Sequence, residues 1–132
     1  MKTWTFLLCT AMALVVASPA DAQTINPTQI QFAASPDHNL TVGATPVVSN
    51  YQLDVITTAA GGALAFTVNL AKPTPDASNL ITANVTQLTA LANGLYTGSV
   101  SAVGPGGATK SVPSDPFGRV GPPAAPGKPT AR

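Results

Sequence analysis

His38 is the residue whose chemistry would be most useful near neutral pH, because it is the only histidine of the chain and imidazole titrates in that range. It lies in the run Ser35-Pro-Asp-His-Asn39. With a serine and one aspartate it could form a catalytic triad; the aspartates to choose from are Asp37, Asp54, Asp76 and Asp115. No Gly-x-Ser-x-Gly elbow places a nucleophile beside it. We therefore interpret the run as a turn in which Asp37 and Asn39 bond backbone groups.

Metal, glycoside and phosphate chemistry each need residues that this chain supplies poorly. A metal site takes three or four ligands, and the chain has one histidine, one cysteine and no glutamate. The carboxylate pair of a glycosidase would have to come from scattered aspartates. The run Gly104-Pro105-Gly106-Gly107 lacks the Lys-Ser/Thr pair of a phosphate-binding loop. The sequence predicts no enzyme, no metal and no cofactor.

Charge is sparse along the 132 residues, of which 8% are charged. Beyond the first 22 residues there are five lysines or arginines and four aspartates, so five minus four gives a formal net charge of +1. Such a surface has little attraction for nucleic acid or an anionic membrane, and we exclude both as main partners. It also gives little repulsion between copies, which leaves self-association open.

The first 22 residues are typical of a secretory signal peptide. Lys2 gives the positive start, Phe6 to Ala17 form an apolar run too short to span a bilayer, and Ala20-Asp21-Ala22 fits a cleavage site. We predict cleavage after Ala22, with Ala20 as the alternative, and export of the remaining chain. Cys9 would leave with the leader. Acylation of Cys9 is disfavoured, because most of the apolar run follows it.

The rest of the chain alternates between apolar and polar residues in short runs, which predicts an all-β domain of six to seven antiparallel strands. The runs are Gln29–Ala34, Val48–Ile56, Leu64–Leu70, Leu80–Leu88, Tyr96–Ala102 and Ala108–Val112. A helix over Asn79–Asn93 is the alternative to the fourth run. β-Branched residues such as Ile81 and Thr82 favour the strand.

The last two predicted strands form a hairpin. Tyr96, Gly98, Val100 and Ala102 share one face, and Thr97, Ser99 and Ser101 share the other. Gly104 to Gly107 makes the turn, and Pro113 limits how far the return strand can pair. Further on, Gly121 to Pro129 contains four prolines. Residues 119–132 are therefore predicted to be a Pro-rich flexible tail.

Together these runs resemble a fibronectin type III domain, an immunoglobulin-like β-sandwich of seven strands in two sheets. The resemblance covers roughly Ile30 to Phe117 and assigns residues 23–118 to one domain. It implies that Leu91-x-x-Gly94-x-Tyr96 is a tyrosine corner, whose hydroxyl bonds backbone a few residues upstream. It also implies that Tyr51 begins the alternation of the third strand, and that Phe32 replaces the family's core tryptophan on the second.

The chain departs from the family at two further places. Little sequence precedes Ile30, so the first strand is short or absent, which would expose a sheet edge to strand addition or self-assembly. The turn after the sixth strand contains no Arg-Gly-Asp triplet, so the sequence does not support integrin-type adhesion.

We therefore expect a secreted, non-catalytic module that acts by protein binding, adhesion or spacing. Its partner would be an extracellular protein or a surface polymer, contacted through Gly104, Pro105, Gly106 and Gly107. The alternative is a self-assembling surface or filament subunit. A carbohydrate-binding module is a third interpretation, weakened by the scarcity of exposed aromatic residues.

Overall fold

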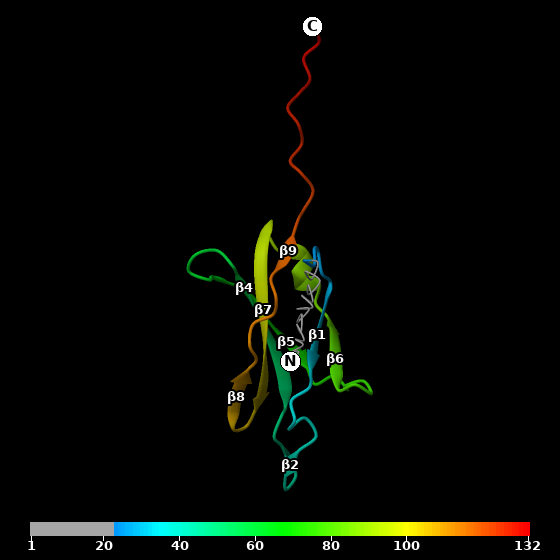
Figure 1. Ribbon diagram of the computed structural model, residues 1–132, viewed down its shortest axis with the longest axis vertical. Helices are drawn as coiled ribbons and strands as arrows, with labels where there is room; N and C mark the ends of the chain where they lie inside the picture. Colours follow the sequence, from blue (N-terminus) through cyan, green and yellow to red (C-terminus); the bar gives the residue numbers. More distant parts are fainter. Residues whose placement is uncertain (1–22) are drawn as a thin grey trace, which may run out of the picture.

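The computed structural model describes residues 23–132, and the predicted signal peptide lies outside this range. The all-β prediction is confirmed (Figure 1). Seven strands have three residues or more, which matches the predicted six to seven, and β2 and β3 have two residues each. The strands are β1 (Gln29–Ala33), β2 (Thr41–Val42), β3 (Thr45–Pro46), β4 (Asn50–Thr57), β5 (Leu64–Ala71), β6 (Leu80–Asn84), β7 (Gly94–Gly104), β8 (Gly107–Lys110) and β9 (Phe117–Arg119).

The strands form three antiparallel sheets. The largest has the order β5-β4-β7-β8, with β9 also paired to β7. A second sheet joins β1 to β6, and β2 and β3 form a small hairpin. Before β1, the chain from Gln23 on contains only an isolated bridge between Ile25 and Gly118. The expectation of a short or absent first strand agrees with this arrangement.

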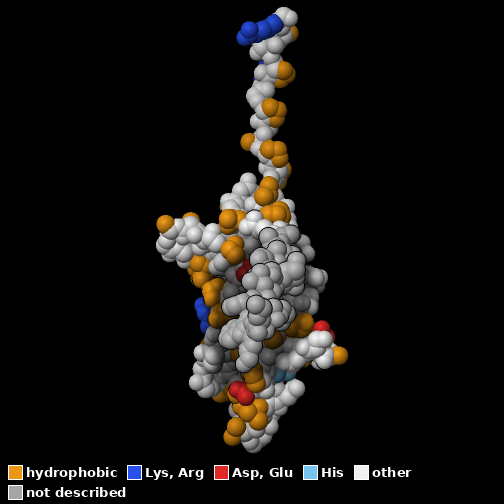
Figure 2. Space-filling view, in the orientation of Figure 1, with side chains coloured by type: hydrophobic (Ala, Val, Ile, Leu, Met, Phe, Trp, Pro, Cys, Tyr) orange, Lys and Arg blue, Asp and Glu red, His pale blue; other side chains and the backbone are white. Residues whose placement is uncertain are grey.

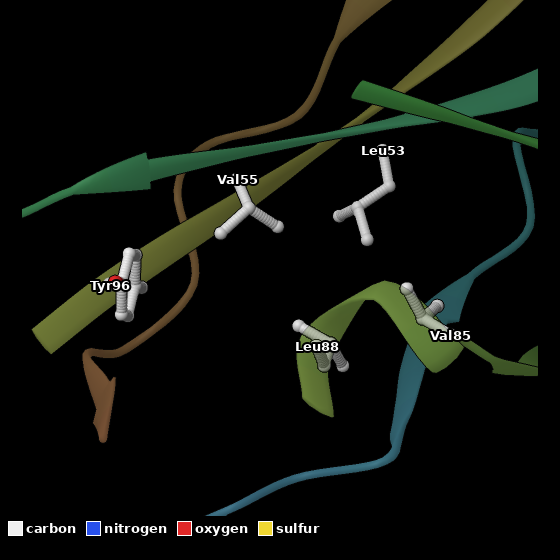
Figure 3. Close-up of a cluster of buried hydrophobic side chains, with 5 residues drawn as sticks. All are labelled: Leu53, Val55, Val85, Leu88 and Tyr96. Carbon is white, nitrogen blue, oxygen red and sulfur yellow. The ribbon is translucent and has the colours of Figure 1, made fainter. Parts of the chain in front are cut away.

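The core lies between the two larger sheets. One cluster joins Leu53 and Val55 of β4 and Tyr96 of β7 to Val85 and Leu88, which follow β6 (Figure 3). A second cluster consists of Ala34, Val48, Tyr51 and Ile81. The alternation of β4 produces this packing, because Tyr51, Leu53 and Val55 all point inward while the residues between them do not.

The predicted strand Leu80–Leu88 is wrong in its second half. β6 ends at Asn84, and a 3-10 helix, η1, runs from Thr86 to Ala90. In a 3-10 helix residues three apart lie on the same side, so the turn brings both Val85 and Leu88 into the core, each 1% exposed. A continuing strand would have pointed Leu88 away from Val85, because its side chains alternate between faces.

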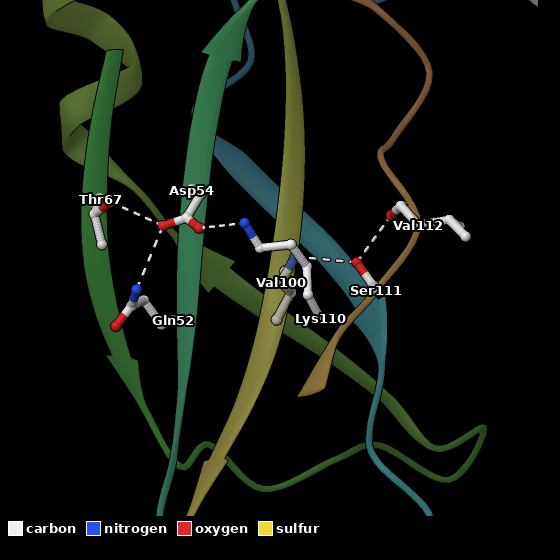
Figure 4. A network of polar contacts seen from close by, with 7 residues as sticks. All are labelled: Gln52, Asp54, Thr67, Val100, Lys110, Ser111 and Val112. Carbon is white, nitrogen blue, oxygen red and sulfur yellow. Dashed lines mark hydrogen bonds and ion pairs between the residues drawn. The ribbon is translucent and has the colours of Figure 1, made fainter. Parts of the chain in front are cut away.

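The outer face of β7 is covered, although its residues are polar as predicted. Lys110 Nζ lies 2.7 Å from Asp54 Oδ2 (Figure 4). The register places Asp54 beside Ser99 and Lys110 beside Ser101. The ion pair thus crosses β7 and leaves Ser99 4% and Ser101 6% exposed. Hydrogen bonding by Lys110, and next by Thr67, lowers the pKa of the Asp54 carboxyl.

Two serines continue the pairing with β7 beyond the end of β8. β8 ends at Lys110 and β9 begins only at Phe117, because Pro113 has no N–H to offer a ladder. In this gap the Ser111 hydroxyl accepts the N–H of Val100, and the Ser114 hydroxyl accepts the N–H of Gly98, both at 3.0 Å. The N–H groups of the same serines donate to the carbonyl oxygens of Val100 and Gly98, both at 2.8 Å, so each serine bonds β7 through its backbone and its side chain.

Residues 120–132 have no regular secondary structure and extend away from the sheets (Figure 1). The last strand, β9, includes Arg119, which pairs with Gly94. The start of the tail is held by asparagines: Asn26 Oδ1 accepts the N–H of Val120, and Asn93 Oδ1 accepts the N–H of Gly121.

Candidate interaction surfaces

His38 is part of a buried polar network rather than an open site. It is 7% exposed, and its Nδ1 lies 2.9 Å from the hydroxyl of Tyr51. That hydroxyl also accepts the N–H of Ser35 at 3.0 Å. The hydroxyl can donate its own proton to Nδ1 or accept one from it, according to the tautomer of His38, and in both cases it joins His38 to the Ser35 backbone.

The turn around His38 is correctly predicted, but its side-chain bonds are not. The Ser35 hydroxyl accepts the N–H of Asp37, and backbone bonds join His38 to Ser35 and Leu40 to Asp37. The sequence predicts that Asp37 and Asn39 make the side-chain hydrogen bonds of this turn. In the structure Ser35 makes such a bond instead, because it is the first residue of the turn, where a serine hydroxyl can accept the N–H of the residue two positions later.

Stability is expected to fall as the pH drops below about 6.5, the usual histidine pKa. Burial, and secondly the positive charge of Lys72, lower the pKa of His38 in the folded chain. Between the pKa of His38 in the folded chain and about 6.5, the unfolded chain binds more protons than the folded chain. The contribution of neutral His38 to stability is therefore complete above pH 6.5, and it is lost as the pH falls toward the folded-state pKa. Melting temperatures from pH 8 to pH 5 measure this, and His38→Asn should remove the step. Parallel curves for the two proteins would contradict it.

Tyr96 lies where a tyrosine corner would place it. Its hydroxyl donates to the carbonyl oxygen of Ala92 at 2.8 Å, and its ring is buried. Gly94 has a φ of +157°, and a side chain there would lie against the Tyr96 ring. Leu91 packs on the same cluster. The motif is therefore one structural unit.

Phe32 is partly buried and packs against the core cluster that contains Tyr51. Its ring packs on Tyr51 with the centroids 5.1 Å apart and the planes at 61°. Its other side lines a groove of about 840 Å³ that runs between β1 and residues 111–117. Core side chains including Leu53 and Val100 line this groove. The groove is formed by segments far apart in the sequence, so alternation along the chain could not locate it.

The predicted contact loop lies at the end of the molecule farthest from the tail, beside the β2–β3 hairpin (Figure 1). Gly104 pairs with Gly107 across the turn Pro105-Gly106, and Gly107 has the positive φ, +122°. A groove of about 640 Å³ separates the two hairpins. Its walls include Pro36, Val42, Pro46, Val48 and the four residues of the turn.

Backbone packing holds the two walls of this groove together. A Cβ at Gly104 would overlap the carbonyl oxygen of Val47, and Ser49 N–H donates to the carbonyl oxygen of Val103 at 2.7 Å. Gly104 is therefore required for close approach and not for a positive φ. The sequence predicts a turn at this glycine, whereas the contact with Val47 is evident only from the structure.

Charged side chains are few on the visible face of the molecule (Figure 2). Within residues 23–132 no three His, Cys, Asp or Glu side chains lie close enough together to hold a metal ion. In the same range no helix has the length and apolar character needed to cross a membrane. Comparisons with protein family models, curated proteins and solved structures find no match to this chain.

Proposed function

We propose that this chain is a secreted, non-catalytic module of the fibronectin type III-like sandwich type, and that it binds an extracellular protein or surface polymer. The observation that carries the proposal is the groove of about 640 Å³ between the two hairpins. Its walls are joined to the core through Val48, which is buried, and through Ala102 of β7, which packs against the same cluster. Loops held by a rigid framework are the usual place for binding residues.

The groove suits an uncharged, partly apolar ligand. Val42 at its rim is 73% exposed. Asp37 is the only charged side chain among the residues that line it. Affinity would therefore come from apolar contact and backbone hydrogen bonds rather than from ion pairs, and it should depend little on salt.

Binding is expected to be lost when Gly106 is replaced by arginine. A Cβ at Gly106 meets nothing within 4 Å, so the variant should fold while it adds a long charged side chain to the wall of the groove. Gly127→Arg, also in open space, adds the same charge on the tail and should bind normally. The measurement is saturable binding of the labelled protein to envelope material of the producing cells. Equal binding by all three proteins, or none by the wild type, would refute this site.

A further inference from the structure

β1 has one unpaired edge, which faces the groove of about 840 Å³. Within residues 23–132, β1 pairs only with β6, and the register runs from Gln29 to Ala33 without a shift. The strand contains no proline and no charged residue, so it lacks the features that usually protect an edge. Residues 29–32 line the groove and no residue of β6 does. The groove therefore lies on the side of β1 that is away from β6.

The hydrogen bonds at the two ends of the β1–β6 ladder indicate which backbone groups of β1 are available. Val85 N–H donates to the Thr28 carbonyl, and Ala34 N–H donates to the Asn79 carbonyl. Hydrogen-bonded pairs alternate in an antiparallel ladder, so the even-numbered residues of β1 bond β6. The odd-numbered residues therefore point their N–H and C=O groups away from β6, and two of them line the groove: Gln29 and Gln31.

The walls of the groove favour an extended, apolar occupant that carries positive charge. Leu53 and Val55 of the core line the groove, so an apolar occupant would extend the core. Phe32 and Phe117 line it as well, and grooves lined by aromatic side chains are the usual binding sites of proline-rich segments. Asp115 is the only charged residue among those that line the groove. A cation on the occupant would complement it.

The C-terminal tail, residues 120–132, has these properties. It contains four prolines, three alanines and two glycines, and its two charged side chains, Lys128 and Arg132, are both positive. A polyproline II segment makes no internal hydrogen bonds, so its carbonyl oxygens are available to the free N–H groups of β1. In that conformation the tail extends about 40 Å, which exceeds the length of about 17 Å expected for five residues of β1.

The tail is directed away from the groove of its own chain. Asn26 and Asn93 accept the N–H groups of its first two residues, Val120 and Gly121. From there the tail extends away from the sheets (Figure 1). A groove on another molecule is therefore within its reach.

We propose that the tail of one copy of this chain lies in the groove beside β1 of a second copy, with Lys128 close to Asp115. The contact joins two different surfaces, so further copies can add head to tail and form an open chain. The groove beside β1 is separate from the groove between the hairpins. This association therefore does not depend on the proposed function.

Removal of the tail after Gly121 tests the occupant. The shortened protein keeps all strands and both residues that the asparagines hold. In light scattering, the average mass of the full-length protein should rise with concentration, whereas the shortened protein should stay monomeric. A shortened protein that still associates would assign the association to another surface and overturn the proposal, as would a full-length protein that is monomeric at all concentrations.

A synthetic peptide of residues 120–132 tests the binding directly. It should bind the shortened protein saturably. The control peptide has the same charge and should bind at least about tenfold more weakly, because the prolines restrict the unbound peptide. It carries Pro122→Ala, Pro123→Ala, Pro126→Ala and Pro129→Ala. Equal binding by the two peptides, or no binding by the first, would contradict the proposal.

Reversal of the two charges locates the contact. Asp115→Lys should raise the Kd of association roughly fivefold at low salt, and Lys128→Asp should do the same, as expected for an exposed ion pair. The two changes alter the net charge in opposite directions, so net charge cannot explain both losses. The double variant restores an opposite pair, and its Kd should return to within about twofold of the wild type. A double variant that is no tighter than either single variant would overturn the placement of the tail beside Asp115.

Discussion

Replacing Gly104 with alanine is expected to lower the free energy of unfolding by about 3 kcal/mol. The added methyl group would overlap the Val47 carbonyl oxygen, and this neighbour is backbone that cannot rotate away. Forced shifts of this kind in packed regions typically cost about 1–3 kcal/mol. Because the overlap lies between the two hairpins, the groove between them should open as well. Urea unfolding followed by circular dichroism gives the value.

Gly106→Ala is the matched control for this change. It lies two residues away in the same turn, and a Cβ there has no neighbour within 4 Å. Its effect should stay within about 0.5 kcal/mol, as for most open surface positions. If the two variants were equally stable, the close approach of β7 to Val47 would have no energetic role.

Tyr51→Phe is expected to cost about 2 kcal/mol. The change keeps the ring but removes an oxygen that accepts from Ser35 N–H and bonds His38 Nδ1. Both groups would be left without this partner in a buried place, and each unsatisfied buried group costs about 1–3 kcal/mol. The pH dependence assigned to His38 should also change, because Nδ1 would lose its hydrogen-bond partner.

Tyr96→Phe serves as the comparison. Its hydroxyl makes one hydrogen bond, to the Ala92 carbonyl, which has a second lone pair and can reach water. A loss of about 1 kcal/mol is therefore expected. Equal losses for the two tyrosines, measured by the same urea unfolding, would show that the network around Tyr51 adds nothing beyond a single bond.

The regular part of the fold follows from the sequence because it depends on neighbours along the chain. The alternation at Tyr51, Leu53 and Val55 predicts both the strand and its buried face. The stretch after Asn84 is different, because β-branched residues favour a strand there. The gain from burying both Val85 and Leu88 outweighs that local preference, and it depends on packing against β4 and β7.

The candidate sites are less accessible to sequence reasoning, because they depend on contacts between distant residues. The turn Gly104 to Gly107 is predictable, but its contact with Val47 is not. Likewise, nothing in the sequence predicts that Asp54 and Lys110 form an ion pair across β7. The alternating composition of β5 predicts a strand, whereas its position at an edge follows only from the order of the sheet.

The tail leaves the molecule at the end opposite to the two hairpins (Figure 1). Residues 120–132 in a polyproline II conformation would extend about 40 Å. Coupling the protein to a sensor chip or bead through its C-terminal residues would therefore hold the hairpin groove toward the solution and well clear of the support. The tail is thus a suitable attachment point for oriented immobilisation. Random coupling through lysines would give a weaker and more heterogeneous binding signal.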